Sequence, residues 1–335
     1  MTTQPLHPTR ERSFFLPALL IAIGGLWLLG NVGILSIANL AMLARLWPLI
    51  LIVLGAYILV KPRYEGIRSL IALGGIGLIV VLTLVGPALG WSRGAEAVAE
   101  TYTEAINGAE AVTVRLDLAA ADTTVSPLTD SNELFAADIR YIGEVTFDVQ
   151  GGANRQIHLR NEANNFQLFD ITGIGDGSLR WDVGLNAAVP VNLTINGGAG
   201  SSALHLMDLN LTGLDYNMGA GSLDLELPGT ESPYRVDLNG GAGSINITIE
   251  EGAALTLDID GGAGSLDLDV PDDAAVRING KTGVGSINVP AGYERISGGD
   301  DFVGSDGVWV SPNWDGSDRQ IDIIYNGGVG SVTIR

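Results

Sequence analysis

The sequence predicts an N-terminal α-helical transmembrane anchor of about three helices, followed by an all-β C-terminal domain. We expect the domain to be a β-solenoid whose coils of about 22 residues each contain two short strands. Two observations lead to this prediction. Charge and hydropathy are divided between the two halves of the chain, and a glycine-rich tag recurs at a nearly constant interval in the second half. The mean hydropathy of +0.29 and the net charge of −20 therefore describe neither half alone.

The first 93 residues contain seven Lys/Arg and two Asp/Glu, together with three apolar stretches. Because about 20 apolar residues cross a hydrocarbon core as a helix, we expect a tail over 1–13 and an anchor over 14–92. The expected spans cover about 14–35, 46–62 and 69–91.

Five of the seven Lys/Arg then lie on the side of the N-terminus, which indicates that this side is cytoplasmic. The prediction is a multi-pass cell-membrane protein with an extracytoplasmic C-terminal domain. A cleaved signal peptide over residues 1–38 is the alternative, but its apolar region is long for such a peptide.

The composition of residues 94–335 excludes several function classes. This half contains 36 Asp/Glu against 11 Lys/Arg, and its only lysine is Lys281, so it repels the phosphates of nucleic acids. The chain has no cysteine, which excludes disulfides, thiol nucleophiles and thiolate metal sites. His7, His158 and His205 are too scattered to suggest a metal cluster. We expect no catalytic residue, no cofactor and no enzymatic activity.

The tag G-[AV]-G-S defines the repeat of the second half. Its intervals are 21, 22, 21, 21 and 45 residues, of which the last is about two periods. The six tag serines are Ser201, Ser222, Ser244, Ser265, Ser286 and Ser331. Between tags, runs such as LDLDV and VRIN alternate apolar and polar residues, which predicts strands.

One coil cannot bury enough apolar surface to fold alone, so the coils must stack into a continuous rod. We expect a linker over 93–110 and an acidic solenoid over 111–335, with a cap region over about 287–335.

Aligned repeats place one polar column at a turn of the coils. Its members are Asn196, Asn217, Asn239, Asp260, Lys281 and Asn326. Stacked amides can hydrogen-bond from coil to coil, so the column predicts a structural ladder. In this alignment Asp260 lies beside Lys281.

A second column places Asp215, Asp237 and Asp258 in three consecutive coils. One interpretation is a solvated acidic face that Arg235 and Arg277 balance. The other is a site for a divalent cation such as Ca²⁺ or for a basic partner, because carboxylates are ligands for both.

The segment before the last tag contains the aromatic residues Phe302, Trp309 and Trp314. A solenoid needs its end covered, so these residues are expected in a cap. A partner-binding patch is the alternative. Self-association of the rod through its ends is also open.

Several segments resemble the bacterial LiaF-like, or toast-rack, cell-envelope proteins. FLPALLIAIGGLWLLGNVGIL and LWPLILIVLGAYILV resemble the LiaI/LiaF-type transmembrane region. VRLDLAAADTTVSPLTDSNELFAADIRY resembles the toast-rack N-terminal segment, and GGAGSLDLDVP and IDIIYNGGVGSVTIR resemble the β-stacked C-terminal domain.

The resemblance implies an accessory protein or regulator of envelope stress signalling, which in some members acts with a histidine kinase and a response regulator. Related β-domains are provisionally described as adhesins, and the family is associated with an even number of spans rather than three.

The leading hypothesis is therefore a membrane-anchored, non-catalytic sensor or scaffold that acts through protein contacts, with a membrane sensor kinase as one possible partner. A surface adhesion or cation-dependent binding module is the second hypothesis. A glycan-active β-helix enzyme is the third.

Overall fold

The computed structural model describes residues 46–60, 65–85, 97–118, 120–162, 179–230, 232–300, 304–317 and 319–335. The chain divides into two compact units. One comprises residues 1–96 and 165–175, and the other comprises residues 97–164 and 176–335.

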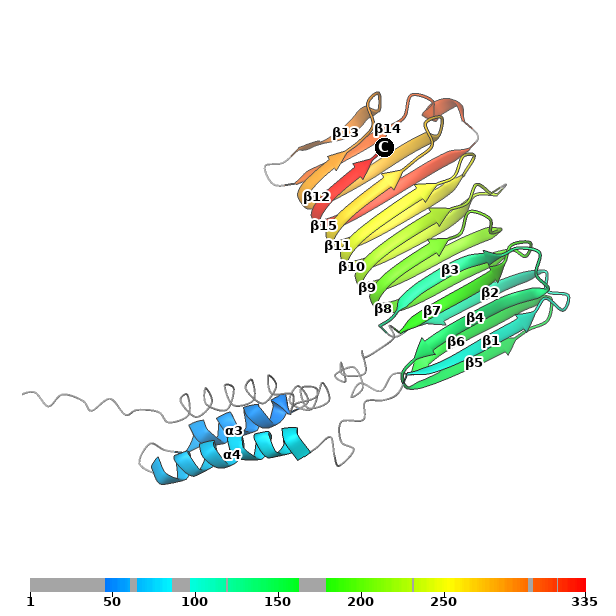
Figure 1. The fold of residues 1–335 in the computed structure, drawn as a ribbon. Helices are drawn as coiled ribbons and strands as arrows, with labels where there is room; N and C mark the ends of the chain where they lie inside the picture. The colour runs from blue at the N-terminus through cyan, green and yellow to red at the C-terminus, as the bar shows by residue number, and fades with distance from the viewer. Residues whose placement is uncertain are drawn as a thin grey trace, which may run out of the picture. The chain divides into compact units, whose positions relative to one another are not determined.

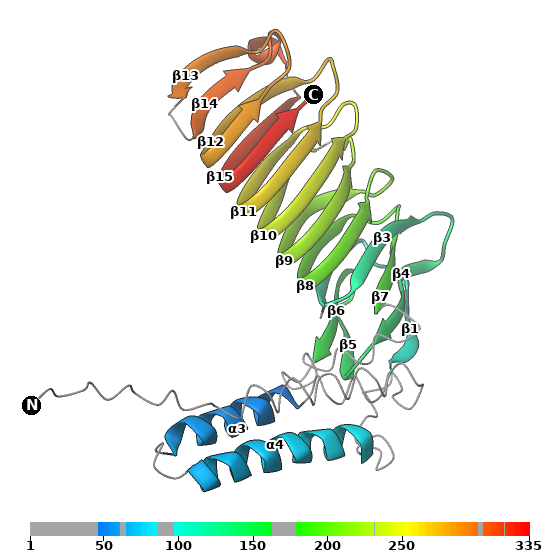
Figure 2. The same cartoon turned by 60° about the vertical axis from the view of Figure 1, so that its left-hand side comes forward.

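The helical unit contains α3 (Trp47–Leu59) and α4 (Glu65–Val85), which lie side by side (Figures 1 and 2). Their contact depends on a glycine. A Cβ atom at Gly75 would come within 2.5 Å of Val53 Cγ1, so only a residue without a side chain fits there. Small residues at such positions let two apolar helices approach closely.

The two helices expose large aliphatic side chains, among them Ile52, Leu59 and Leu70, which are 65%, 84% and 72% exposed. Neither of the two helices in the described part of the chain combines the length and the apolar composition that crossing a membrane requires. The span expected over 14–35 lies outside the described residues.

The β unit begins with seven shorter strands and continues with eight more, six of which are long. The shorter strands are β1 (Val98–Ala105), β2 (Ala111–Asp117), β3 (Asp122–Leu128), β4 (Glu133–Tyr141), β5 (Glu144–Gln150), β6 (Asn154–Glu162) and β7 (Arg180–Asn186). The others are β8 (Val191–His205), β9 (Leu211–Leu227), β10 (Tyr234–Ile249), β11 (Leu255–Asp269), β12 (Ala275–Asn288), β13 (Glu294–Asp300), β14 (Ser305–Val310) and β15 (Gln320–Ile334).

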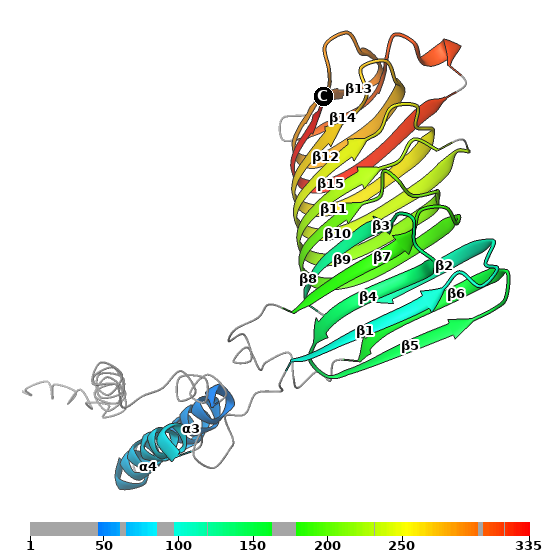
Figure 3. The same cartoon turned by 45° about the vertical axis from the view of Figure 1, so that its right-hand side comes forward.

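The shorter strands form two layers that both join β8 (Figure 3). One layer is β5–β6–β2, which pairs with the first half of β8, and the other is β1–β4–β7–β3, which pairs with its second half. The fully buried side chains of Leu116, Phe135 and Trp181 belong to the core. Arg155 of one layer reaches Glu104 of the other at 3.6 Å.

The linker expected over 93–110 is therefore wrong in part, because β1 pairs with β4 along its whole length. Its side chains are mostly exposed at the sheet edge, so its sequence lacks the clear alternation of an inner strand.

The long strands stack in parallel with their tags in register, as Figures 1 and 2 show. Each long strand runs through its tag and bends there without ending. The prediction of two short strands per coil is corrected to one long, bent strand. The reason is the second glycine of each tag. Gly243, for example, has a φ of +153°, and it redirects the backbone while the flanking residues stay paired.

The spatial order of the coils differs from their order in the sequence. The long strands lie in the order β8–β9–β10–β11–β15–β12, so the C-terminal strand β15 is inserted between β11 and β12. The interval of 45 residues before the last tag is therefore not two stacked periods. It is the length of chain that forms β13 and β14 and then returns into the sheet.

The cap expected over 287–335 is accordingly smaller. Strands β14 and β13 continue the sheet beyond β12 as antiparallel strands, whereas β15 belongs to the stack itself. Trp309 of β14 packs into the end of the core and is 6% exposed. Arg295 lies over its ring at 5.0 Å.

Replacement of Gly243 by alanine is expected to destabilise the β unit by about 2–5 kcal/mol, because its Cβ atom would lie 1.7 Å from the Gly221 carbonyl oxygen. Gly240→Ala, at the residue just before the same tag, is the matched control. Its Cβ atom would meet only Ile245 Cδ1, at 3.7 Å. Urea unfolding followed by circular dichroism measures both variants, and equal unfolding midpoints would contradict the proposed role of the tag corner.

Candidate functional site

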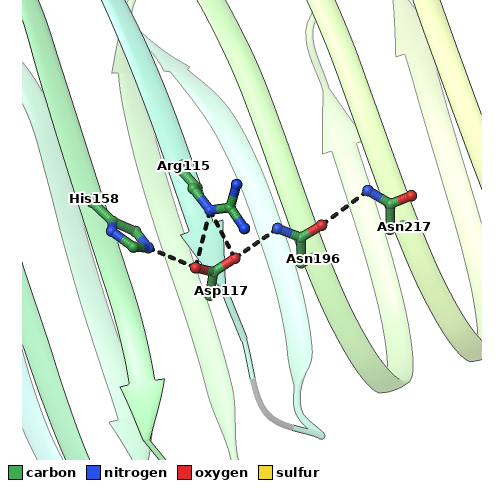
Figure 4. Close-up of polar contacts among 5 residues, drawn as sticks. All are labelled: Arg115, Asp117, His158, Asn196 and Asn217. Atoms are coloured by element: carbon green, nitrogen blue, oxygen red, sulfur yellow. Dashed lines mark hydrogen bonds and ion pairs between the residues drawn. The ribbon is translucent and has the colours of Figure 1, made fainter.

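Polar side chains gather on the outer surface where the first half of the long strands meets β2 and β6. We call Arg115, Asp117, His158, Asn196 and Asn217 the Asp117 network (Figure 4). Strand pairing places Asp117 beside Asn196, and Asn196 beside Asn217. The network therefore joins four adjacent strands, β6, β2, β8 and β9.

Asp117 is the centre of this network and accepts bonds from three directions. Arg115 Nε lies 3.1 Å from Asp117 Oδ1 and 3.0 Å from Oδ2. Asn196 Nδ2 donates to Oδ1 at 2.6 Å, and His158 Nε2 lies 2.6 Å from Oδ2. Both carboxylate oxygens are thus committed to neighbouring strands.

The amides beyond Asp117 form a ladder with one direction. Asn217 Nδ2 donates to Asn196 Oδ1 at 2.9 Å, and Asn239 Nδ2 donates to Asn217 Oδ1 at 2.9 Å. Every donor points toward the carboxylate, so the aligned amide dipoles end on a negative charge. Hydrogen bonds arranged in this way polarise one another.

The pKa of Asp117 reflects this arrangement. Its partial burial alone would raise the pKa, but the hydrogen bonds from Arg115, Asn196 and His158 and the charge of Arg115 lower it from 3.8 to about 2. The carboxylate is therefore ionised at neutral pH, in the form that accepts the amide ladder.

At the end of the ladder away from Asp117, the order of the residues differs from the predicted order. Asp260 pairs with Asn326, and Asn326 pairs with Lys281. The expected neighbours Asp260 and Lys281 are thus separated by the inserted strand β15. On the other side, Lys281 pairs with Asp306 of β14.

The acidic column lies in register next to the ladder, since Asp237 pairs with Asp215 on one side and with Asp258 on the other. Arg235 Nη2 lies 2.7 Å from oxygens of both Asp237 and Asp258, while Asn217 Nδ2 donates to Asp215 at 2.9 Å.

Arg277, the other expected counter-charge, instead pairs with Asp322 of β15. Across the described residues no group of three or more His, Cys, Asp or Glu side chains is placed to hold a metal ion. The Arg235 guanidinium thus lies between carboxylates that a cation would have to bind, which favours the interpretation of this column as a balanced acidic face.

The aromatic residues divide between core and surface. The partner-binding interpretation is wrong for Trp309, because its ring is buried in the end of the core. Trp314 is partly exposed, and the Arg277 guanidinium lies over its ring at 5.2 Å. Phe302 lies outside the described residues.

Sequence reasoning missed the centre of the network. Arg115 and Asp117 precede the first tag, so an alignment of tags does not reach them. A signal was present nevertheless, because Arg115-Leu-Asp117 has the same local pattern as Arg235-Val-Asp237. In both, the arginine bonds to the aspartate two residues later.

Two family models match the chain. The LiaI-LiaF-like transmembrane region matches residues 14–59, and the N-terminal domain of toast_rack, DUF2154, matches residues 93–248. No curated protein matches.

Among solved structures, the chain is similar to a protein of Clostridium sporogenes provisionally described as a cell adhesion protein. The identity is 18%, the match covers 71% of this chain and 99% of the other, and the TM-score is 0.48. A protein of Parabacteroides merdae, provisionally described as an adhesin, matches at 12% identity over 71% of this chain and 96% of its own, with a TM-score of 0.23.

Asp117→Asn is expected to lower the free energy of unfolding of the β unit by about 1–3 kcal/mol at pH 6, because it removes a charged acceptor shared by three strands. Since folding lowers the pKa of Asp117, its contribution is present above pH 3.8 and is lost as the pH falls toward 2. Urea unfolding at pH 6 and pH 2 should therefore show a difference between wild type and variant that shrinks in acid.

The control for this comparison is Asp208→Asn, which changes an exposed carboxylate in the turn after β8. Asp117→Asn should change the free energy of unfolding more than the control does, and this change should depend on pH. A change that is the same at both pH values, or one equal to that of the control, would contradict the proposed role of Asp117.

Proposed function

Because the chain is a LiaF-like, toast-rack protein with a LiaI-LiaF-like transmembrane region, we propose that it is a membrane-anchored, non-catalytic sensor or scaffold of the cell-envelope stress response. In this proposal the β unit lies outside the cytoplasm and acts through protein contacts. A membrane sensor kinase is the kind of partner that the family resemblance favours.

One observation carries the proposal, namely that the β unit is a continuous stack of in-register coils. Its apolar side chains fill the core, and several of its outer polar side chains bond to neighbouring coils. Such a stack provides a long, rigid and acidic outer surface, which suits binding to another protein.

The strongest arrangement of acid–base groups in the described residues also fits a structural role. A histidine beside an aspartate is part of the catalytic triad of hydrolases. In this protein, however, the same Asp117 carboxylate also holds Arg115 and the amide ladder. The His158–Asp117 contact therefore supports strand pairing.

The membrane attachment is supported by the match of residues 14–59 and by the exposed aliphatic side chains of α3 and α4. The three-span arrangement and the extracytoplasmic β unit are proposed from the distribution of Lys and Arg. These basic residues are concentrated on the side of the N-terminus.

Cysteine labelling tests the proposed topology, because the natural chain has no cysteine. We expect Thr248→Cys, an exposed position on β10, to react with a membrane-impermeant maleimide in intact cells. The control Thr3→Cys, in the N-terminal tail, should react only after the membrane is permeabilised. The opposite pattern would contradict an extracytoplasmic β unit.

The regulatory role is tested separately by deleting the gene and measuring transcription from envelope-stress promoters after treatment with cell-wall antibiotics. Induction should change several-fold in the deletion strain and return to the wild-type level with the full chain. Unchanged induction of every such promoter would contradict the stress-response role while leaving the membrane topology intact.

A further inference from the structure

The C-terminal strand β15 is the one long strand that enters the stack out of sequence order. β9, β10 and β11 each pair with the long strand that precedes them in the chain. β12 does not pair with β11, because β15 lies between them and pairs with both. The space between β11 and β12 is therefore a slot for a parallel strand that carries a tag.

The slot holds β15 by contacts that do not depend on which chain supplies the strand. Ile321, Ile323 and Val332 are each 1% exposed within the core. The backbone of Arg335 bonds to both Leu268 and Val270 at 3.0 and 2.8 Å. An identical strand from a second copy would make the same contacts.

A strand that enters the slot must have glycine at one position. Gly330 has a φ of +154°, and a Cβ atom there would lie 1.8 Å from the Gly264 carbonyl oxygen. The entering strand must also carry a negative charge that matches β12, since Asp322 of β15 forms an ion pair with Arg277 of β12. A second copy of this chain meets both requirements.

The chain segment before β15 is long enough for this strand to reach another molecule. β15 is joined to β14 by the nine residues 311–319. β14 and β15 flank β12 on opposite sides, about two strand spacings or roughly 10 Å apart. Nine residues can extend to roughly 30 Å, so the connection is much longer than this crossing requires.

We propose that β15 is an exchangeable strand and that the slot between β11 and β12 takes β15 from a second copy, which gives a strand-swapped dimer. A swapped dimer keeps every contact of the slot and changes only the course of residues 311–319. Attachment of the copies to one membrane raises their local concentration and favours exchange during folding. This pairing goes beyond the proposed regulatory role and does not depend on it.

Two single-cysteine chains test the exchange. Asp267 of β11 pairs with Thr333 of β15, and a disulfide requires Cα atoms less than about 7 Å apart. Full-length Asp267→Cys and Thr333→Cys chains with different affinity tags are co-expressed, and their membranes are oxidised with copper phenanthroline. A disulfide between the two chains is expected, because β15 of one chain lies beside β11 of the other.

The matched control replaces Asp267→Cys by Asn246→Cys. Asn246 lies in the same outer column but one coil farther from β15, because it pairs with Asp267. We expect the Asp267 and Thr333 pair to give about tenfold more linked chains than this control pair. Equal yields, or no linked chains in either sample, would overturn the exchange.

Adding Gly330→Ala to the Thr333→Cys chain provides a second comparison, since this strand no longer fits the slot. The link between chains should then be lost. A link that persists would show that the two cysteines meet outside the slot and would overturn the proposal.

Discussion

The stacking of glycine backbone on glycine backbone at the tag corner is the contact on which the rest of the β unit depends. The second glycine of each tag has φ between +145° and +154°, and a Cβ atom there would lie less than 2.3 Å from a carbonyl oxygen of the adjacent backbone segment. Glycine is the residue that allows this conformation and this closeness together. Each long strand therefore bends at the same place, and all coils keep one register.

This shared register also arranges the chemistry of the outer surface. Side chains at equivalent positions lie one strand spacing apart, which suits amides and penalises like charges. The asparagines therefore form a hydrogen-bonded ladder that ends on Asp117, and the three adjacent aspartates need Arg235 between them. Some of the outer carboxylates, such as Asp117, Asp258 and Asp322, bond to side chains of neighbouring strands, so an acidic patch by itself says little about a ligand.

The sequence was sufficient to predict the features that repeat. Tag spacing predicted coils, alternation predicted which side chains face inward, and the column through Asn196, Asn217 and Asn239 predicted a ladder. The position of β15 could not be predicted from the sequence. All long strands share one register, so equivalent side chains meet whichever strand lies next to which. Asp260 can lie beside Lys281 or beside Asn326 with equally good local patterns. Asp117 was missed because it lies on β2, before the first tag.

Spin-label distances test the order of the coils most directly. Ala203, Asn288 and Thr333 lie in one outer column of β8, β12 and β15. The observed order puts Thr333 four strand spacings from Ala203, roughly 19 Å, and Asn288 five spacings away, roughly 24 Å. Double electron–electron resonance on cysteine variants should find Ala203 closer to Thr333 than to Asn288. The reverse order, with Asn288 roughly 19 Å and Thr333 roughly 24 Å from Ala203, would contradict the inserted C-terminal strand.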